Sequence, residues 1–168
     1  MKLIVAVAKN WAIGHNGGLL FDLPDDMAFF RRTTLNKVVV MGRNTLLSFP
    51  GGKPLKNRTN IVLTTNTEFE AEGCTICHSF QELFEELKNY NSDDVFVIGG
   101  GKIYNELYPY CSEAYITKVD AVEDADTFLH NFDEDEEWYL SYASEVHENN
   151  GFKFIFNTYK NKSIKNLE

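Results

Sequence analysis

The sequence VFVIGGGKIYNEL, residues 95–107, runs from an apolar strand through three glycines into a helix. This arrangement brings backbone N–H groups close to a bound phosphate, and the positive end of the helix dipole adds attraction. It does not match the known motifs, because the dinucleotide fingerprint requires glycine at Tyr104 and a P-loop requires glycine at Phe96 and serine or threonine at Ile103. Glycine also permits close packing of a helix on a strand, so this stretch alone leaves both interpretations open.

A second strand-to-helix turn repeats this design. The sequence VVVMGRNTLLSF, residues 38–49, is an apolar strand followed by Gly42, the cation Arg43 and Thr45 at the start of a helix. Such a turn also suits an anion. Two such turns in one small domain indicate an elongated ligand with more than one phosphate, which favours a dinucleotide.

The rest of the chain alternates short apolar runs with helical patterns, which is typical of an α/β sheet with mostly parallel central strands. Asn150 and Gly151 suit a positive-φ turn, so the last two runs are predicted to form an antiparallel hairpin at one end of the sheet. We expect a single domain over residues 1–160, with a twisted sheet flanked by about four helices, and a frayed tail over residues 161–168. The expected strands are 2–8, 37–42, 59–65, 74–79, 94–100, 113–120, 137–147 and 152–160, and the expected helices are Pro24–Leu35, Arg43–Phe49, Ser79–Tyr90 and Lys102–Tyr108.

The composition favours a small-molecule partner. The 168 residues carry a formal net charge of −9, which disfavours nucleic acids and anionic membranes because both bind basic surfaces. No apolar run approaches the length of a bilayer span, and the run at 3–8 is shorter than a signal-peptide core, so we expect a cytoplasmic protein. The sequence CTICH at 74–78 fits the haem-attachment pattern, but it reads as a short strand whose cysteines face opposite ways, so we expect no haem and no metal.

Two adjacent acids, Asp25 and Asp26, follow Pro24 at the start of a predicted helix. Acids there complement the helix dipole, which explains one of them as a structural feature. Helical spacing places Phe29 and Phe30 on the face of Asp26, whereas Asp25 lies about 100° round, toward solvent. A carboxylate among aromatic rings is costly unless it is paired, and burial tends to raise its pKa, so Asp26 is a candidate for binding a ligand with N–H donors.

Five segments, in this order and spacing, resemble the dihydrofolate reductase family: AIGHNGGLLFDLPDD, VVVMGRNT, KNRTNIVLTT, VIGGGKIY and YITKVDAVEDADTF. The resemblance covers Leu3 to about Tyr159 and implies NADPH-dependent reduction of 7,8-dihydrofolate to 5,6,7,8-tetrahydrofolate, by hydride transfer to pterin C6 and protonation at N5. It implies that Asp26 binds the pterin 2-amino group and N3, and that Arg58 holds the α-carboxylate of the glutamate tail. The other positions implied in the folate pocket are Ile4, Val5, Met27, Phe30, Phe49, Leu55, Ile98 and Thr117.

The same resemblance implies NADPH as the cofactor. Ala6 and Ile13 would touch the nicotinamide. The pyrophosphate would be held by Arg43, Asn44, Thr45 and the turn Gly100, Gly101, Lys102, Ile103 and Tyr104. Arg43, Thr64 and Thr65, helped by Lys102, would also read the 2′-phosphate, which favours NADPH over NADH. The other positions implied on the cofactor side are Gly14, Leu19, Gly42, Leu63 and Ile98. The glycine-rich segment at 13–23 is expected to be a lid over the site.

The chain departs from the family pattern just before the acid. Leu20 and Phe21 stand where the family usually has Pro-Trp, and Leu19 stands where bacterial members commonly have methionine. Phe21 keeps the bulk but removes an indole N–H that in the family helps hold a water near the acid. We count Phe21 and Leu19 with Asp26 as catalytic positions, and expect the chemical step to depend on pH differently than in a Trp-bearing relative.

Two alternatives stay open from the sequence. One is another NADPH-dependent reductase on this scaffold, such as a pyrimidine reductase of flavin synthesis, which would not need Asp26, Thr117 and Arg58 together. The other is a folate- or nucleotide-binding module without turnover, suggested by Phe21. We expect dihydrofolate as the substrate and a monomer. No catalytic role is assigned to the histidines His15, His78, His130 and His147.

Overall fold

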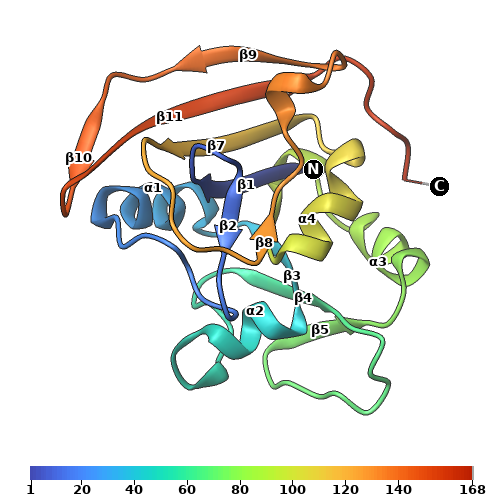
Figure 1. Ribbon diagram of the computed structural model, residues 1–168. Coiled ribbons are helices and arrows are strands. Elements are labelled where there is room, and N and C mark those ends of the chain that lie inside the picture. The colour runs from blue at the N-terminus through green and yellow to red at the C-terminus, as the bar shows by residue number, and fades with distance from the viewer. Residues whose placement is uncertain (168) are drawn as a thin grey trace.

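The apolar runs form one mixed sheet in the computed structural model, which describes residues 1–167 (Figure 1). Its central part is parallel, as predicted, because helices connect most of these strands. The order across the sheet is β5, β4, β3, β6, β1, β7 and then β11, which runs antiparallel to β7. The parallel strands are β1 (Lys2–Val7), β3 (Val38–Gly42), β4 (Thr59–Leu63), β5 (Cys74–Cys77), β6 (Val95–Gly99) and β7 (Glu113–Val119).

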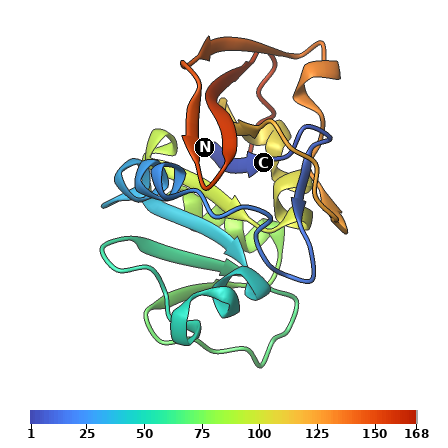
Figure 2. The same ribbon diagram turned by 60° about the vertical axis from the view of Figure 1, so that its left-hand side comes forward.

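The antiparallel C-terminal strands lie at the opposite end of the sheet from β5 (Figure 2). They are β9 (Trp138–Ala143), β10 (His147–Asn149) and β11 (Phe152–Asn161). The predicted hairpin is confirmed, since Asn150 and Gly151 take φ values of 51° and 82° between β10 and β11. The prediction of one strand over 137–147 is wrong, because Ser144 interrupts it: its hydroxyl accepts the Phe156 N–H at 2.8 Å.

The residues after 160 contact the body of the domain. Asn161 still belongs to β11 and donates its side-chain N–H to the Cys111 carbonyl at 3.0 Å. The Lys165 N–H donates to the Pro109 carbonyl at 2.9 Å, and Leu167 packs against the core. The strand therefore extends past its predicted end, and Glu168, the last residue of the predicted tail, lies outside the described residues.

The helices lie close to their predicted positions. They are α1 (Pro24–Thr34), α2 (Arg43–Ser48), α3 (Phe80–Leu87) and α4 (Gly101–Leu107). Ser79 caps α3 by accepting the Glu82 N–H at 3.1 Å. Short turns of 3-10 helix occupy Pro50–Gly52, Ser92–Asp94, Tyr108–Tyr110 and Phe132–Glu134. In the described part of the chain no helix combines the length and apolar character required to cross a bilayer.

The sheet has an apolar cluster on each face, because neighbouring strand residues point to opposite sides. In β3, for example, Val38 and Val40 belong to one cluster, whereas Val39 and Met41 belong to the other. Helices α3 and α4 contribute to the first cluster, and α1 and α2 to the second (Figure 1). This double cover explains the continuous apolar runs of the central strands.

A small second sheet was not predicted. It pairs β2 (Ala12–Gly14) with β8 (Thr127–Phe128) near the start of α4 (Figure 1). These strands are too short to show a period in the sequence. They matter because they join the predicted lid to a segment more than a hundred residues later.

Candidate active site

Asp26 lies in the first turn of α1, beside the C-terminal half of β7. The buried Thr117 of β7 donates its hydroxyl to Asp26 Oδ1 at 2.6 Å. Asp26 is half-buried and Asp25 is exposed, so the two adjacent acids have the different surroundings that helical spacing predicts. Pro24 occupies the first turn, where its missing N–H costs nothing.

The surroundings of Asp26 change its acidity. Burial raises the pKa of Asp26, and the hydrogen bond from Thr117 lowers it in part. The fully buried hydroxyl of Tyr104 donates to the Ile4 carbonyl at 2.8 Å, and burial with the nearby Asp26 charge raises the pKa of Tyr104, so the phenol stays neutral. The Asp26 carboxyl can therefore bind N–H donors, and it holds a proton at a higher pH than an exposed aspartate does.

The C-terminal hairpin holds the start of α1. The Asp25 N–H donates to Asn149 Oδ1 at 2.9 Å, and Asn149 Nδ2 donates back to Asp25 Oδ2 at 3.1 Å. Asn150 Nδ2 donates to the Asp22 carbonyl at 2.9 Å. These bonds fix the end of the predicted lid and the helix that carries Asp26 against the β10–β11 turn.

Most residues expected in the folate pocket gather in one apolar cluster. Two residues expected in the pocket, Val5 and Met27, do not join this cluster. Val5 packs against the cluster on the other face of the sheet, because it neighbours Ile4 along a strand, and Met27 is 43% exposed. The members that the structure brings together are Ile4, Phe30, Phe49, Leu55 and Ile98.

Arg58 is fixed at the C-terminal end of α1. Its Nε donates to Thr34 Oγ1 at 3.2 Å, Nη1 to the Lys56 carbonyl at 2.7 Å and Nη2 to the Arg31 carbonyl at 2.9 Å. A guanidinium has more N–H groups than these bonds use, so both terminal nitrogens can still donate to one carboxylate. Burial and Arg31 lower the pKa of Arg58, but an arginine stays charged at any physiological pH.

The two predicted anion-binding turns lie against each other, because β3 pairs with β6. A Cβ atom on Gly42 would lie 3.2 Å from Ile103 Cγ1, and one on Gly99 or Gly100 would lie 3.2 or 3.4 Å from Thr45 Oγ1. Side chains at these glycines would therefore push the turns apart. The glycines therefore allow the two strand-to-helix turns to lie close together, which is the arrangement expected of two turns that share the pyrophosphate of a dinucleotide.

Gly101, the third glycine, faces the small β2–β8 sheet. A Cβ on Gly101 would collide with the methyl group of Thr127 and would lie 3.6 Å from Ile13 Cδ1. Ile13, the residue expected to touch the nicotinamide, therefore lies beside the start of α4. Thr127 was not predicted as a site residue, and only the pairing of β8 with β2 places it here.

The positions expected to read a 2′-phosphate follow β3 and β4. Gly42 pairs with Leu63, so Arg43 and Thr64 emerge from neighbouring strands. His78, to which the sequence assigned no role, lies with Nδ1 at 3.0 Å from the Thr64 carbonyl. Arg43 and Thr65 are exposed; Lys102 is also exposed and lies at the limit of an ion pair, 4.0 Å from Glu106.

The predicted lid is anchored by a residue that the sequence did not reveal. The Asn16 N–H donates to Asp126 Oδ2 at 2.8 Å, and hydrogen bonds from Asn16 and Thr127 lower the pKa of Asp126. Asp126 lies inside one of the family-like segments, but its partner is 110 residues away. No pattern of neighbouring residues in the sequence predicts such a contact.

Leu19 and Phe21, where the chain departs from the family pattern, have different surroundings in the structure. Leu19 is 80% exposed, so the structure does not bring this predicted catalytic and cofactor position into the site. Phe21 packs edge to face on Phe152, with ring centroids 5.0 Å apart, beside the buried Leu23 and Phe154. Phe21 therefore joins the end of the lid to the C-terminal hairpin.

Comparisons with known proteins agree with this geometry. Residues 1–161 match the family model described as dihydrofolate reductase. The chain is 33% identical to dihydrofolate reductase of Bacillus subtilis, over 97% of this chain and 95% of that one, and 36% identical to the Haemophilus influenzae enzyme, over 84% of each. A solved structure of Enterococcus faecalis dihydrofolate reductase complexed with NADP(H) and RAB-propyl has a TM-score of 0.84 at 33% identity, covering 96% of both chains.

Proposed function

The chain belongs to the dihydrofolate reductase family, and from this premise we propose that Asp26 is its active-site acid. The protein catalyses the NADPH-dependent reduction of 7,8-dihydrofolate to 5,6,7,8-tetrahydrofolate. The observation that carries the assignment of Asp26 is the 2.6 Å hydrogen bond from Thr117 to a half-buried carboxyl. This bond holds the Asp26 side chain against β7, and Phe30, one helical turn further along α1, packs against the apolar cluster expected to hold the pterin.

Asp26 binds the pterin through its remaining acceptor sites. Oδ1 already accepts the Thr117 hydroxyl, so Oδ2 and the second lone pair of Oδ1 receive the pterin 2-amino group and N3. When bound, NADPH supplies the hydride that adds to pterin C6, and N5 receives a proton. The raised pKa of Asp26 lets it relay this proton or stabilise the protonated pterin electrostatically.

The lid and the two turns position the cofactor. Asn16, held by Asp126, keeps the lid against the β2–β8 sheet, so that the lid excludes water from the reacting atoms. The backbone of the two closely packed turns at Gly42, Gly99 and Gly100 receives the pyrophosphate, and Arg43 with Thr64 and Thr65 receives the 2′-phosphate. The other cofactor positions named from the sequence remain part of this proposal, except that Leu19 is exposed.

The activity is tested by the absorbance of NADPH with and without dihydrofolate. Oxidation of NADPH that requires dihydrofolate identifies the reaction. Oxidation that requires a pyrimidine intermediate of flavin synthesis would favour the related reductase, and binding without oxidation would favour a module without turnover. The family match and the relatives favour the first outcome over both alternatives.

We expect the change of Arg43 to glutamine to weaken NADPH binding by on the order of tenfold, because a charged hydrogen bond to the 2′-phosphate is lost. NADH lacks this phosphate, so its affinity should change far less. Fluorescence titration of both cofactors gives the two dissociation constants. An equal loss for NADPH and NADH would place Arg43 at the pyrophosphate instead.

The role of Phe21 predicts a shift in pH dependence. The change of Phe21 to tryptophan adds an indole N–H beside the start of α1, which can hold a water near Asp26. We expect the midpoint of the pH profile of hydride transfer to move. The measurement is single-turnover NADPH oxidation over a pH series, with circular dichroism as a check that packing on Phe152 is preserved. An identical profile would contradict a role for Phe21 in the chemical step.

The localisation, the oligomeric state and the extent of the domain are also part of the proposal. We propose a cytoplasmic monomer that forms a single domain, whose expected boundary at residue 160 is moved to include the residues up to 167 that contact it. Light scattering after gel filtration would test the monomer. A mass of two chains would contradict it.

A further inference from the structure

Trp11 has a backbone conformation that a bulky side chain rarely adopts. Its φ is 66°, in the left-handed region, where the Cβ atom crowds the following carbonyl. In the part of the chain that the structure describes, every other non-glycine residue with positive φ is an asparagine, a residue type that tolerates this region. These are Asn16, Asn36, Asn57 and Asn150. The turn at residue 11 therefore suits asparagine, and the presence of tryptophan is explained by its side chain.

The Trp11 ring is held in an aromatic cage formed by Lys118, Phe132, Asp133 and Tyr159. Trp11 is only 6% exposed, and its ring centroid lies 5.9 Å from that of Phe132 and 6.3 Å from that of Tyr159. Lys118 Nζ lies over the same ring, 5.0 Å from its centroid. Asp133 fixes the cage, because Lys118 Nζ donates to its Oδ2 at 2.6 Å and the Tyr159 hydroxyl donates to its Oδ1 at 2.7 Å. The position of the ring is therefore set by segments far along the chain.

The backbone of Trp11 lies where the lid begins. Its N–H donates to the Ala8 carbonyl at 3.0 Å, just after β1, and its carbonyl accepts the Leu129 N–H at 2.8 Å, just after β8. Strand β2 starts at the next residue, and its Ile13 lies beside Gly101 at the start of α4. Ile13 also packs against the apolar cluster that contains the Trp11 ring. A movement of Trp11 would therefore move both Ile13 and the small β2–β8 sheet.

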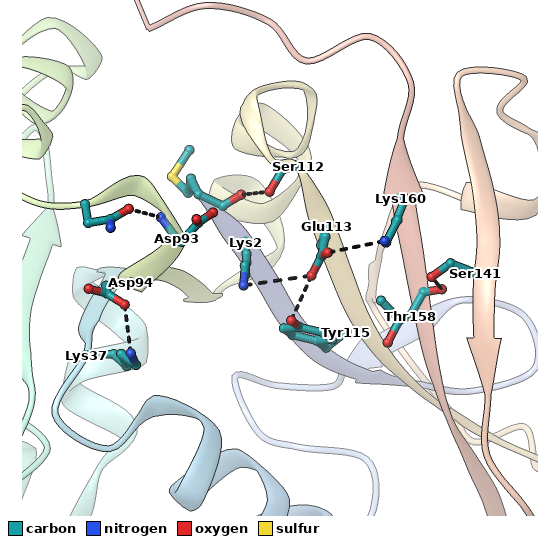
Figure 3. Close-up of polar contacts among 12 residues, drawn as sticks. Lys2, Lys37, Asp93, Asp94, Ser112, Glu113, Tyr115, Ser141, Thr158 and Lys160 are labelled. Carbon is teal, nitrogen blue, oxygen red and sulfur yellow. Dashed lines mark hydrogen bonds and ion pairs between the residues drawn. The ribbon is translucent and has the colours of Figure 1, made fainter.

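A structural explanation is that the indole only fills the core. Trp138, the second tryptophan of the chain, fits that description: it is 5% exposed and packs on Phe132, with ring centroids 4.6 Å apart. It belongs to β9, which is fixed to β11, for example by the Ser141 hydroxyl donating to the Thr158 carbonyl at 3.0 Å (Figure 3). Trp138 is therefore a control that shares the apolar cluster and the ring type of Trp11 but does not lead into the lid.

We propose that Trp11 is a positioning residue for hydride transfer: its caged ring fixes the start of β2 and thereby sets how Ile13 meets the nicotinamide. The inference rests on the proposed function, in which Ile13 touches the nicotinamide. Proximity and orientation supply much of the rate of such a step, and a displacement of about 1 Å can slow it by on the order of a hundredfold. The expected dihydrofolate pocket belongs to the apolar cluster on the other face of the sheet, so Trp11 does not set the affinity for dihydrofolate.

The test compares the variants Trp11→Asn, Trp11→Phe and Trp138→Leu with the wild type. Asparagine suits the φ at this position and removes the ring, so Trp11→Asn separates the side chain from the turn. We expect single-turnover NADPH oxidation to slow about tenfold in Trp11→Asn, with KM for dihydrofolate little changed, and Trp11→Phe to recover most of the rate. Trp138→Leu should keep the wild-type rate, although it removes a ring from the same cluster.

A second measurement does not depend on activity. The Leu129 N–H donates directly to the Trp11 carbonyl, so hydrogen exchange of this amide reports whether residue 11 stays in place. We expect it to exchange about tenfold faster in Trp11→Asn than in Trp138→Leu, once urea unfolding has given the global stability of each variant. If Trp11→Asn does not fold, Trp11→Leu takes its place, because it loses the same ring as Trp138→Leu and keeps an apolar side chain.

The opposing outcomes are distinct. A wild-type rate with unchanged exchange in Trp11→Asn would mean that only the turn matters, and would overturn the proposal. Equal slowing in Trp11→Asn and Trp138→Leu would assign the effect to lost core packing, and would overturn it as well. If the wild type does not oxidise NADPH in the presence of dihydrofolate, the proposed function fails together with the role in hydride transfer, whereas faster exchange at Leu129 would still show that Trp11 holds the start of β2.

Discussion

Replacing Asp26 by asparagine is expected to slow hydride transfer by about 10²–10⁴-fold, which is the usual contribution of a positioned acid or a fixed charge. The variant keeps an oxygen that can accept the Thr117 hydroxyl, so the geometry of the 2.6 Å contact survives while the charge and the proton are lost. Single-turnover oxidation of NADPH in the presence of dihydrofolate measures this step directly. NADPH affinity should change little, because Asp26 lies on the folate side.

Asp25→Asn is the matched control for this experiment. It removes the same charge one residue earlier, at an exposed position, and it can keep the hydrogen bonds to Asn149. Comparable losses in both variants would indicate a general effect of charge at the start of α1, and would contradict the assignment of Asp26 as the acid.

The Asp26→Asn change should also make the protein more stable at neutral pH. Burial raises the pKa of Asp26, so the folded protein binds its proton more tightly than the unfolded chain does. The ionised carboxylate therefore destabilises the fold. This destabilisation is complete above the pKa of Asp26 in the folded protein and absent below the ordinary aspartate pKa of about 3.9. We expect Asp26→Asn to raise the free energy of unfolding at pH 7, with the gain disappearing as the pH falls through this window. Urea unfolding at several pH values measures it, and a variant less stable at pH 7 would contradict it.

Replacing Arg58 by glutamine is expected to raise KM for dihydrofolate by on the order of a hundredfold, because a bidentate pair with a carboxylate combines two charged hydrogen bonds. The side chain is already oriented by Thr34 and by the carbonyls of Arg31 and Lys56, so little ordering remains when the substrate binds. The turnover number should change much less than KM, because the glutamate tail is remote from the reacting atoms. Initial rates over a range of substrate concentrations separate the two.

Dihydropteroate, which lacks the glutamyl residue, provides the control for Arg58. Its carboxylate is on the benzoate ring and does not extend to the position of the glutamate α-carboxylate that Arg58 is proposed to bind, so the wild type and Arg58→Gln should have similar KM values for it. A hundredfold loss with dihydropteroate as well would mean that Arg58 acts by holding the end of α1 through Thr34, and not by binding the tail. Thermal unfolding of the variant would then show a matching loss of stability.

A feature could be predicted from the sequence when residues close together in the chain determine it. Features set by neighbours in the chain were predicted well: the parallel central strands, the Asn150–Gly151 turn, and the different surroundings of Asp25 and Asp26. Errors occurred where a distant partner interrupted a local pattern, as at Ser144, which is bonded to Phe156 across the ladder. The 80% exposure of Leu19 likewise follows from the course of the folded chain and not from its neighbours in the sequence.

The sequence by itself determined the class of fold, the two glycine turns and the acid at the start of a helix, because strand period, helical period and turn chemistry act over a few residues. Only the tertiary structure decided what surrounds that acid and what holds the lid. Thr117 reaches Asp26 across 91 residues, Asn16 reaches Asp126 across 110, and Asn149 reaches Asp25 across 124. A hydrogen bond depends on the positions of its two groups in space, and these positions are set only when the sheet has paired and the helices have packed against it.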